Sequence, residues 1–177
     1  GPIAVVTVNH PPVNALNIPM RKGLVEALQR ARQDKEVQAV VIAAAGRTFV
    51  AGADITEFNK PPVPPTTIDV IEVIDAMPKP VVAALHGTPL GGGLEVALGC
   101  HFRVAAPGTR LGLPEIKLGL MPGAGGTQRL PRLVGMDKAM AIILSGDPID
   151  ADDALKYGLV DEIASGELLP AAIAFAK

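Results

Sequence analysis

The sequence is poor in residue types that several functions need. Among its 177 residues it has one cysteine, Cys100, no tryptophan and only 3% aromatic residues. One cysteine cannot form an internal disulfide, and no basic segment followed by an apolar run opens the chain. We therefore expect a reducing compartment, either the cytoplasm or a mitochondrial or peroxisomal matrix. The scarcity of aromatic rings argues against base stacking on single-stranded nucleic acid.

Neither sign of charge dominates the chain. Its 16 Lys and Arg residues nearly balance its 18 Asp and Glu residues, giving a formal net charge of −2. Such a chain lacks the broad basic field that binds nucleic acid. Its most apolar stretch, Pro80 to Leu94, is interrupted by glycine and proline and is too short to span a bilayer. We expect no nucleic-acid partner and no membrane span.

Several catalytic motifs are also missing. The only serines, Ser145 and Ser165, lie outside any G-x-S-x-G sequence, so hydrolysis by serine attack is poorly supported. The three histidines lack metal-ligand spacing relative to the cysteine or a carboxylate, so we expect no metal site. The segment GAGGTQ has Gln128 where a dinucleotide fingerprint requires glycine.

What the sequence does contain is a series of short apolar runs separated by turn residues. Buried parallel strands are indicated by continuous β-branched runs, and helices by apolar residues at helical spacing. In the first half this predicts strands at 3–8, 38–46 and 79–87, and helices at 19–33 and 67–77. In the second half it predicts extended segments at 102–106, 109–116 and 159–163, and helices at 127–133, 137–144, 151–158 and 168–177. The pattern favours one α/β domain over residues 1–177.

Two glycine-rich turns stand out against this background. Gly91, Gly92 and Gly93 join an apolar run to a helix that begins around Glu95, and a shorter turn, AGAD, covers 51–54. The first amides of a helix have no partner within it and can receive an anion or a developing oxyanion. A second acid in apolar surroundings, Glu115, follows in the sequence Leu-Pro-Glu-Ile.

These motifs resemble the enoyl-CoA hydratase/isomerase (crotonase) family. The similar stretches are AGADITEF, HGTPLGGGLEVALGC, PEIKLGLMPGAGGTQRLPRLVG and LSGDPIDADDALKYGLVDEI, in the family's order. The resemblance implies a crotonase-like fold of repeated ββα units wound in a spiral, truncated before the C-terminal helices. It is strongest to the hydratase portion of bifunctional fatty-acid oxidation enzymes. We therefore expect a fragment of a longer chain, in a trimer-type homo-oligomer or a bifunctional polypeptide.

The resemblance also implies a reaction and its residues. The backbone amides of Ala53 and Gly92 would bind the thioester oxygen of an acyl-CoA substrate. Glu95 would orient and deprotonate water, Glu115 would protonate the α-carbon, and Gly123 would help to hold the water. The implied reaction hydrates trans-2-enoyl-CoA to 3-hydroxyacyl-CoA, with coenzyme A entering only as part of the substrate and with no metal or other cofactor.

Contacts to coenzyme A are implied for six residues in two segments. Asp54 is also expected to brace its turn. The basic residue common after AGADI is replaced by Thr56, which removes one phosphate contact from the expectation. The six residues are Ala15, Leu16, Ala51, Ala53, Asp54 and Ile55.

Other interpretations stay open at the level of sequence. Glu95 alone could be a first-turn glutamate favoured by the helix dipole, and Glu115 an ordinary salt-bridged acid. The same scaffold also suits Δ3-Δ2 enoyl-CoA isomerisation or another acyl-CoA reaction. A third reading is a non-catalytic acyl-CoA-binding domain.

Overall fold

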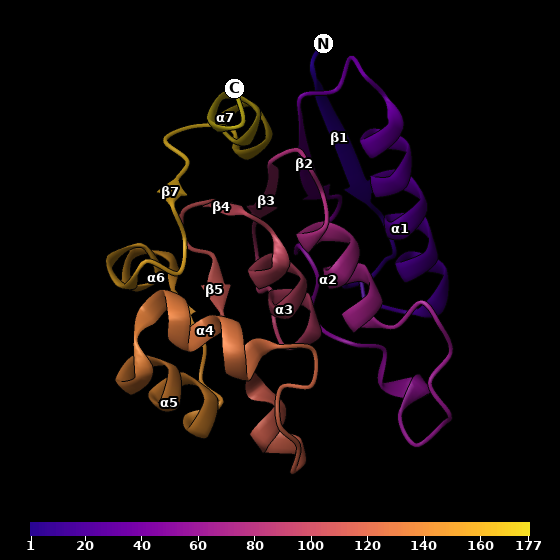
Figure 1. Ribbon diagram of the computed structural model, residues 1–177. Coiled ribbons are helices and arrows are strands. Elements are labelled where there is room, and N and C mark those ends of the chain that lie inside the picture. Colours follow the sequence, from indigo (N-terminus) through magenta and orange to yellow (C-terminus); the bar gives the residue numbers. More distant parts are fainter.

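Five parallel strands form the main sheet, in the order β1-β2-β3-β4-β7. The computed structural model describes residues 1–177 (Figure 1). Nearly every residue of β2 and β3 is buried, because helices cover both faces of these central strands. This explains their uninterrupted apolar sequences. The strands are β1 (Ile3–Val8), β2 (Ala39–Ala44), β3 (Val81–Leu85), β4 (Phe102–Ala105) and β7 (Glu162–Ile163).

Alternate residues of the strands enter two separate cores. Val40 and Ile42 pack in the larger core with apolar residues from α1 (Ile18–Gln33), α2 (Thr67–Asp75) and α3 (Gly92–Gly99). Their neighbours Val41 and Ala43 lie in a smaller core on the opposite face. The C-terminal helix α7 (Leu168–Phe175) covers that face. The α/β fold expected from the sequence is therefore confirmed.

The second half of the chain adds helices beside the sheet. Helices α4 (Gly126–Val134), α5 (Met136–Ser145) and α6 (Ala151–Tyr157) lie together in Figure 1. A two-stranded antiparallel ribbon, β5 (Arg110–Leu111) with β6 (Ile149–Asp150), connects this region to the core. The helix expected at 151–158 is confirmed: the Asp150 side chain caps its first turn and Gly158, with φ of +78°, ends it.

Two predicted extended segments prove shorter than expected. Of the range 109–116 only Arg110–Leu111 pairs as a strand, because Pro114 opens the 3-10 turn η2 (Pro114–Leu118). Proline fits the first position of such a turn, where its missing amide costs no hydrogen bond. Glu115 thus lies on a turn and not on a strand. Of the range 159–163 only Glu162–Ile163 is strand.

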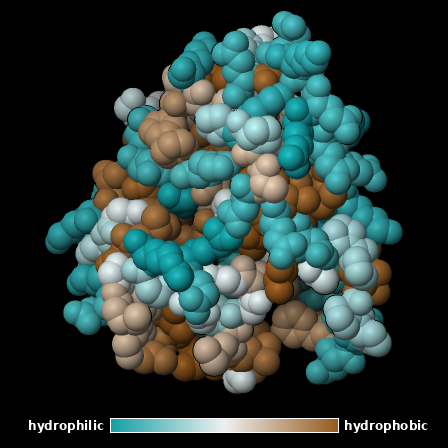
Figure 2. Space-filling view, viewed as in Figure 1, coloured by the Kyte–Doolittle hydropathy of each residue, from teal (hydrophilic) through white to brown (hydrophobic).

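The surface mixes polar and apolar side chains. Figure 2 shows apolar side chains gathering in the lower part of the view, where Figure 1 places α5 and the segment that follows β5. None of the helices combines the length and the apolar character that a bilayer crossing requires. Exposed large apolar residues in this region include Leu118, Met121, Met140 and Leu144.

The buried strand β3 gives a direct test of the fold. Leu85 has no exposed surface, so Leu85→Ala should lower the free energy of unfolding by about 2–5 kcal/mol through lost burial and a cavity. Leu155 on α6 is 43% exposed, and Leu155→Ala should change it by less than about 0.5 kcal/mol. Urea unfolding of both variants measures the difference. Equal losses would contradict this placement of Leu85.

Candidate active site

The turn Gly91–Gly93 packs directly on the segment that follows β2. A Cβ atom on Gly93 would lie 2.1 Å from the carbonyl oxygen of Val50, so no side chain fits there. Gly91 has φ of +51°, a left-handed conformation that favours glycine. The glycines therefore let two distant segments of the chain approach at backbone distance.

Two amides at this junction have no acceptor within the protein. The amides of Gly91 and Gly93 donate to the carbonyls of Gly112 (3.0 Å) and Leu90 (2.9 Å). The amides of Gly92, between them, and of Ala53, on the facing segment, make no such bond. A Cβ atom on Gly92 would lie 3.6 Å from the Ala53 nitrogen, so the two residues are adjacent. The structure thus brings together the two amides predicted to bind a thioester oxygen.

Glu95 is a buried carboxylate held by amides from another helix. It lies in the first turn of α3 and is only 3% exposed. Its Oε1 accepts hydrogen bonds from the amides of Ala124 (2.7 Å) and Gly126 (2.8 Å), at the start of α4. Burial raises the pKa of Glu95, and these two hydrogen bonds partly oppose the rise. Its Oε2 has no partner in the protein and remains available to a ligand.

Glu115 is half-buried and lacks a counter-charge. It belongs to none of the ion pairs of the structure, so the reading as a salt-bridged acid is wrong. Its Oε2 is buried without a hydrogen-bond partner. Burial raises the pKa of Glu115, and the nearby Glu95 charge acts in the same direction. A carboxyl group with a raised pKa is suited to proton transfer.

One cavity of about 580 Å³ contains all of these groups. Both glutamates line it together with Ala53, Gly92 and Gly123. Much of the remaining wall is apolar, which suits an acyl chain. The apolar wall residues include Ile55, Phe58, Pro62, Ile68, Leu90, Leu118, Leu120 and Met121.

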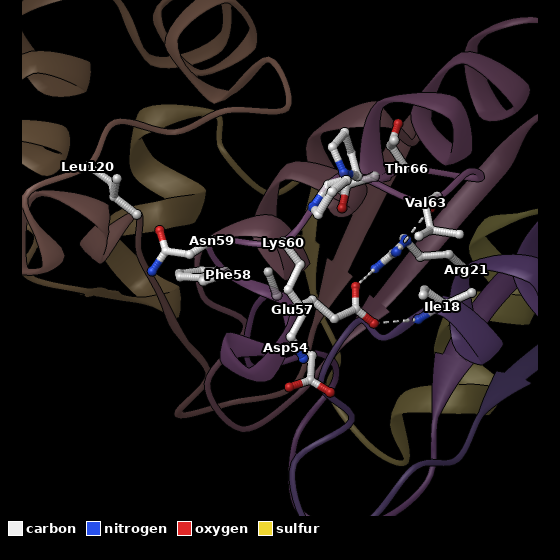
Figure 3. Close-up of a pocket in the computed structure, with 14 residues that line it drawn as sticks. Ile18, Arg21, Asp54, Glu57, Phe58, Asn59, Lys60, Val63, Thr66 and Leu120 are labelled. Atoms are coloured by element: carbon white, nitrogen blue, oxygen red, sulfur yellow. Dashed lines mark hydrogen bonds and ion pairs between the residues drawn. The ribbon is translucent and has the colours of Figure 1, made fainter.

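Figure 3 shows a second cavity, of about 410 Å³. It shares part of its wall with the first cavity. Ala53, Phe58 and Thr66 line both, and Asp54 and Lys60 line only the second. The two cavities therefore lie side by side, with Ala53 in the wall of both.

The predicted coenzyme contacts are only partly gathered at these cavities. Ala51 and Ile55 line the first cavity, Asp54 the second, and Ala53 both. Ala15 lines neither. Leu16 is wholly buried, and its amide already donates to Gly52 while its carbonyl accepts from an arginine. Asp54 also braces its turn as expected, because its Oδ1 accepts from the amide of Thr56 (2.9 Å).

Sequence reasoning missed two groups of supporting residues. The amides of Ala124 and Gly126 that hold Glu95 were not assigned a role, although their glycine-rich helix start was a usable signal. Asn14 was also missed; its side chain donates to the carbonyls of Ala45 (2.8 Å) and Thr48 (2.9 Å) and fixes the loop before α1. No local pattern reveals this second role, because its partners lie some 30 residues away.

The raised pKa of Glu115 predicts a pH-dependent stability difference. A group whose pKa is higher in the folded protein stabilises it below its ordinary pKa of 4.5, and that contribution is lost as pH rises through the folded value. Glu115→Gln should therefore be more stable than the parent at pH 7, with a gap that shrinks toward pH 4. Urea unfolding at both values tests this. Glu26→Gln, at an exposed site on α1, should show no such gap.

The comparisons with known proteins agree with this geometry. The sequence matches the family described as Enoyl-CoA hydratase/isomerase over residues 1–176. The chain is 45% identical to the peroxisomal bifunctional enzyme of Danio rerio over 98% of its own length, but it spans only 24% of that protein. It is 44% identical to a probable enoyl-CoA hydratase of Bacillus subtilis, covering 93% of this chain and 67% of that one.

A solved structure supports the same assignment. Pseudomonas aeruginosa DspI superposes with a TM-score of 0.92 at 36% identity, covering 99% of this chain and 70% of that one. The family match extends over almost every residue described, including both glycine turns and both glutamates. The chain belongs to the enoyl-CoA hydratase/isomerase family.

Proposed function

We propose that this protein hydrates trans-2-enoyl-CoA to 3-hydroxyacyl-CoA, as in fatty-acid β-oxidation. The observation that carries the proposal is the gathering of two unpaired amides and two partly or fully buried glutamates around one cavity. Its partly apolar wall suits the acyl chain. The names of relatives in the family, which include a probable hydratase, point the same way.

The unpaired amides of Ala53 and Gly92 supply the first requirement of the reaction. When water adds to the double bond, negative charge develops on the thioester oxygen. Fixed amide donors stabilise that charge without reorganising, and the loss of one such donor typically costs about 3–4 kcal/mol. Neither amide has a competing acceptor within the protein, which leaves both for the ligand.

The two glutamates supply the acid and the base. In the proposed mechanism, Glu95 takes a proton from water through the oxygen left free by Ala124 and Gly126, and the hydroxyl bonds to C3. Glu115 gives a proton to C2, which restores the neutral thioester. Glu95 then releases the proton that it took to solvent, and Glu115 takes one up from solvent, which returns the site to its starting state. Burial raises the pKa of both carboxyls, but the amides of Ala124 and Gly126 oppose that rise at Glu95 and favour its ionised form, which supports Glu95 as the base and Glu115 as the acid.

The proposal needs no redox group, because hydration adds the elements of water without net oxidation or reduction. Coenzyme A enters as part of the substrate. Since the chain spans about a quarter of the bifunctional relatives, we also propose that it works within a longer, multifunctional polypeptide. The peroxisomal name of a relative makes a peroxisomal matrix one compartment to test by localising the native protein.

Substituting each glutamate separates catalysis from binding. Glu95→Gln and Glu115→Gln should each lower the rate of crotonyl-CoA hydration by roughly 10²–10⁴-fold, because each removes a group that transfers a proton. Loss of absorbance at the conjugated thioester reports the rate, and calorimetry reports the binding of an acyl-CoA analogue, which should persist. The exposed Glu26→Gln serves as the control.

The alternatives give different results in the same assays. Unchanged turnover in both glutamine variants would reject the proposed roles. A parent protein that binds acyl-CoA without turnover would indicate a binding domain. A parent that moves a Δ3 double bond but does not hydrate crotonyl-CoA would indicate an isomerase.

A single methyl group tests the oxyanion site. A Cβ atom on Gly92 would meet only ordinary contacts of 3.6–3.9 Å, so Gly92→Ala should fold. The methyl would occupy the space beside the Ala53 amide and keep a thioester oxygen away, lowering kcat/KM by roughly 10²–10³-fold. Gly23→Ala on α1 meets no atom within 4 Å and should leave the kinetics unchanged. Full activity in Gly92→Ala would rule out this oxygen position.

A further inference from the structure

Arg21 is a buried charge at the rim of the second cavity. It lies in the first turn of α1 and is only 6% exposed. Taking a guanidinium out of water is costly unless several acceptors surround it. A buried arginine is therefore expected to be surrounded by hydrogen-bond acceptors.

The guanidinium of Arg21 meets four acceptors from three segments. Its Nη1 donates to the carbonyl of Leu16 (2.8 Å) and to the Glu57 carboxylate (2.8 Å). Its Nε donates to the carbonyl of Pro65 (2.6 Å), and its Nη2 donates to that of Val63 (3.4 Å). Figure 3 shows the Arg21 and Glu57 side chains pointing toward one another. The Arg21 side chain thus links α1 to both ends of the segment 57–66, which forms part of the wall of the second cavity.

Two of those acceptors, on Leu16 and Glu57, belong to residues close to Ala53. Leu16 pairs with Ala53 in an isolated parallel bridge, in which the Leu16 amide donates to Gly52 (2.9 Å). Glu57 follows Ala53 by one turn, and its Oε1 accepts from the amide of Ile18 (2.9 Å), at the start of α1. The chain is therefore fixed on both sides of Ala53, through Leu16 and through Glu57. The Ala53 amide itself makes no hydrogen bond within the protein, so its direction depends on these neighbours.

We propose that Arg21, with Glu57, is a positioning residue. It orients the Ala53 amide toward the active-site cavity and fixes the segment 57–66. The inference rests on the proposed function, because it assumes that this amide binds the thioester oxygen. An oxyanion donor must point at the developing charge to be effective. Loss of the hydrogen bonds from the Arg21 guanidinium to its four acceptors should therefore lower the rate of the chemical step while leaving the fold intact.

Arg21→Lys in the full-length protein provides the test. Lysine keeps the charge but has no planar fork, so it cannot serve the four acceptors together. With crotonyl-CoA we expect kcat to fall roughly tenfold or more, toward the loss seen when an oxyanion donor is removed. Amide hydrogen exchange should quicken in residues 51–66 of the same variant.

Arg103→Lys is the matched control. Arg103 is 3% exposed, pairs with Asp161 (3.3 Å) and donates to the carbonyls of Leu159 (2.7 Å) and Cys100 (2.8 Å), at the far end of α3 from Gly92. Arg103→Lys should lower the melting temperature about as much as Arg21→Lys does. It should change kcat by less than about twofold and leave amide hydrogen exchange in residues 51–66 unaltered.

The outcomes separate the two proposals. Unchanged kcat and exchange in Arg21→Lys, or an equal loss of kcat in both lysine variants, would overturn the positioning role. A parent protein that does not hydrate crotonyl-CoA would overturn the proposed function, while exchange in 51–66 would still decide the role of Arg21. Should Arg21→Lys fail to fold, Glu57→Gln replaces it, with the same expected direction and a smaller effect.

Discussion

The backbone contact between Gly93 and Val50 determines where the rest of the site lies. Because no side chain separates them, the start of α3 rests directly on the segment that leads from β2 to Ala53. This contact brings two unpaired amides to one cavity, although some 40 residues of chain separate them. It also fixes the first turn of α3, and with it Glu95. A bulkier residue at position 93 would separate the two halves of the site.

The site carries an electrostatic cost that the rest of the fold offsets. Two carboxyls share one cavity, neither has a cationic partner, and burial raises the pKa of both. The buried arginines outside the site differ from these carboxyls, because Arg21 and Arg103 are each surrounded by hydrogen-bond acceptors. Unpaired polar groups concentrated in one cavity are typical of a functional site, where stability is exchanged for reactivity.

Much of this architecture was predictable from the sequence. The apolar runs at 38–46 and 79–87 indicated buried parallel strands, and the helix from Asp150 to Gly158 was predicted from its caps. The family resemblance carried by the glycine motifs implied the amides of Ala53 and Gly92. Prediction was weaker where a partner lies far along the chain. The short strands and the four acceptors of Arg21 depend on tertiary contacts that leave no local periodicity.

The way in which Glu95 is held has a stereochemical consequence. One carboxylate oxygen is occupied by two amides from the start of α4, so only the other oxygen is free to hold water. Because α3 is packed in the core and two amides hold the other oxygen, the position of that free oxygen is restricted. An enoyl thioester is planar at its double bond and presents two mirror-related faces. Water held at a single fixed point reaches only one of them, so an alcohol formed here would have one handedness.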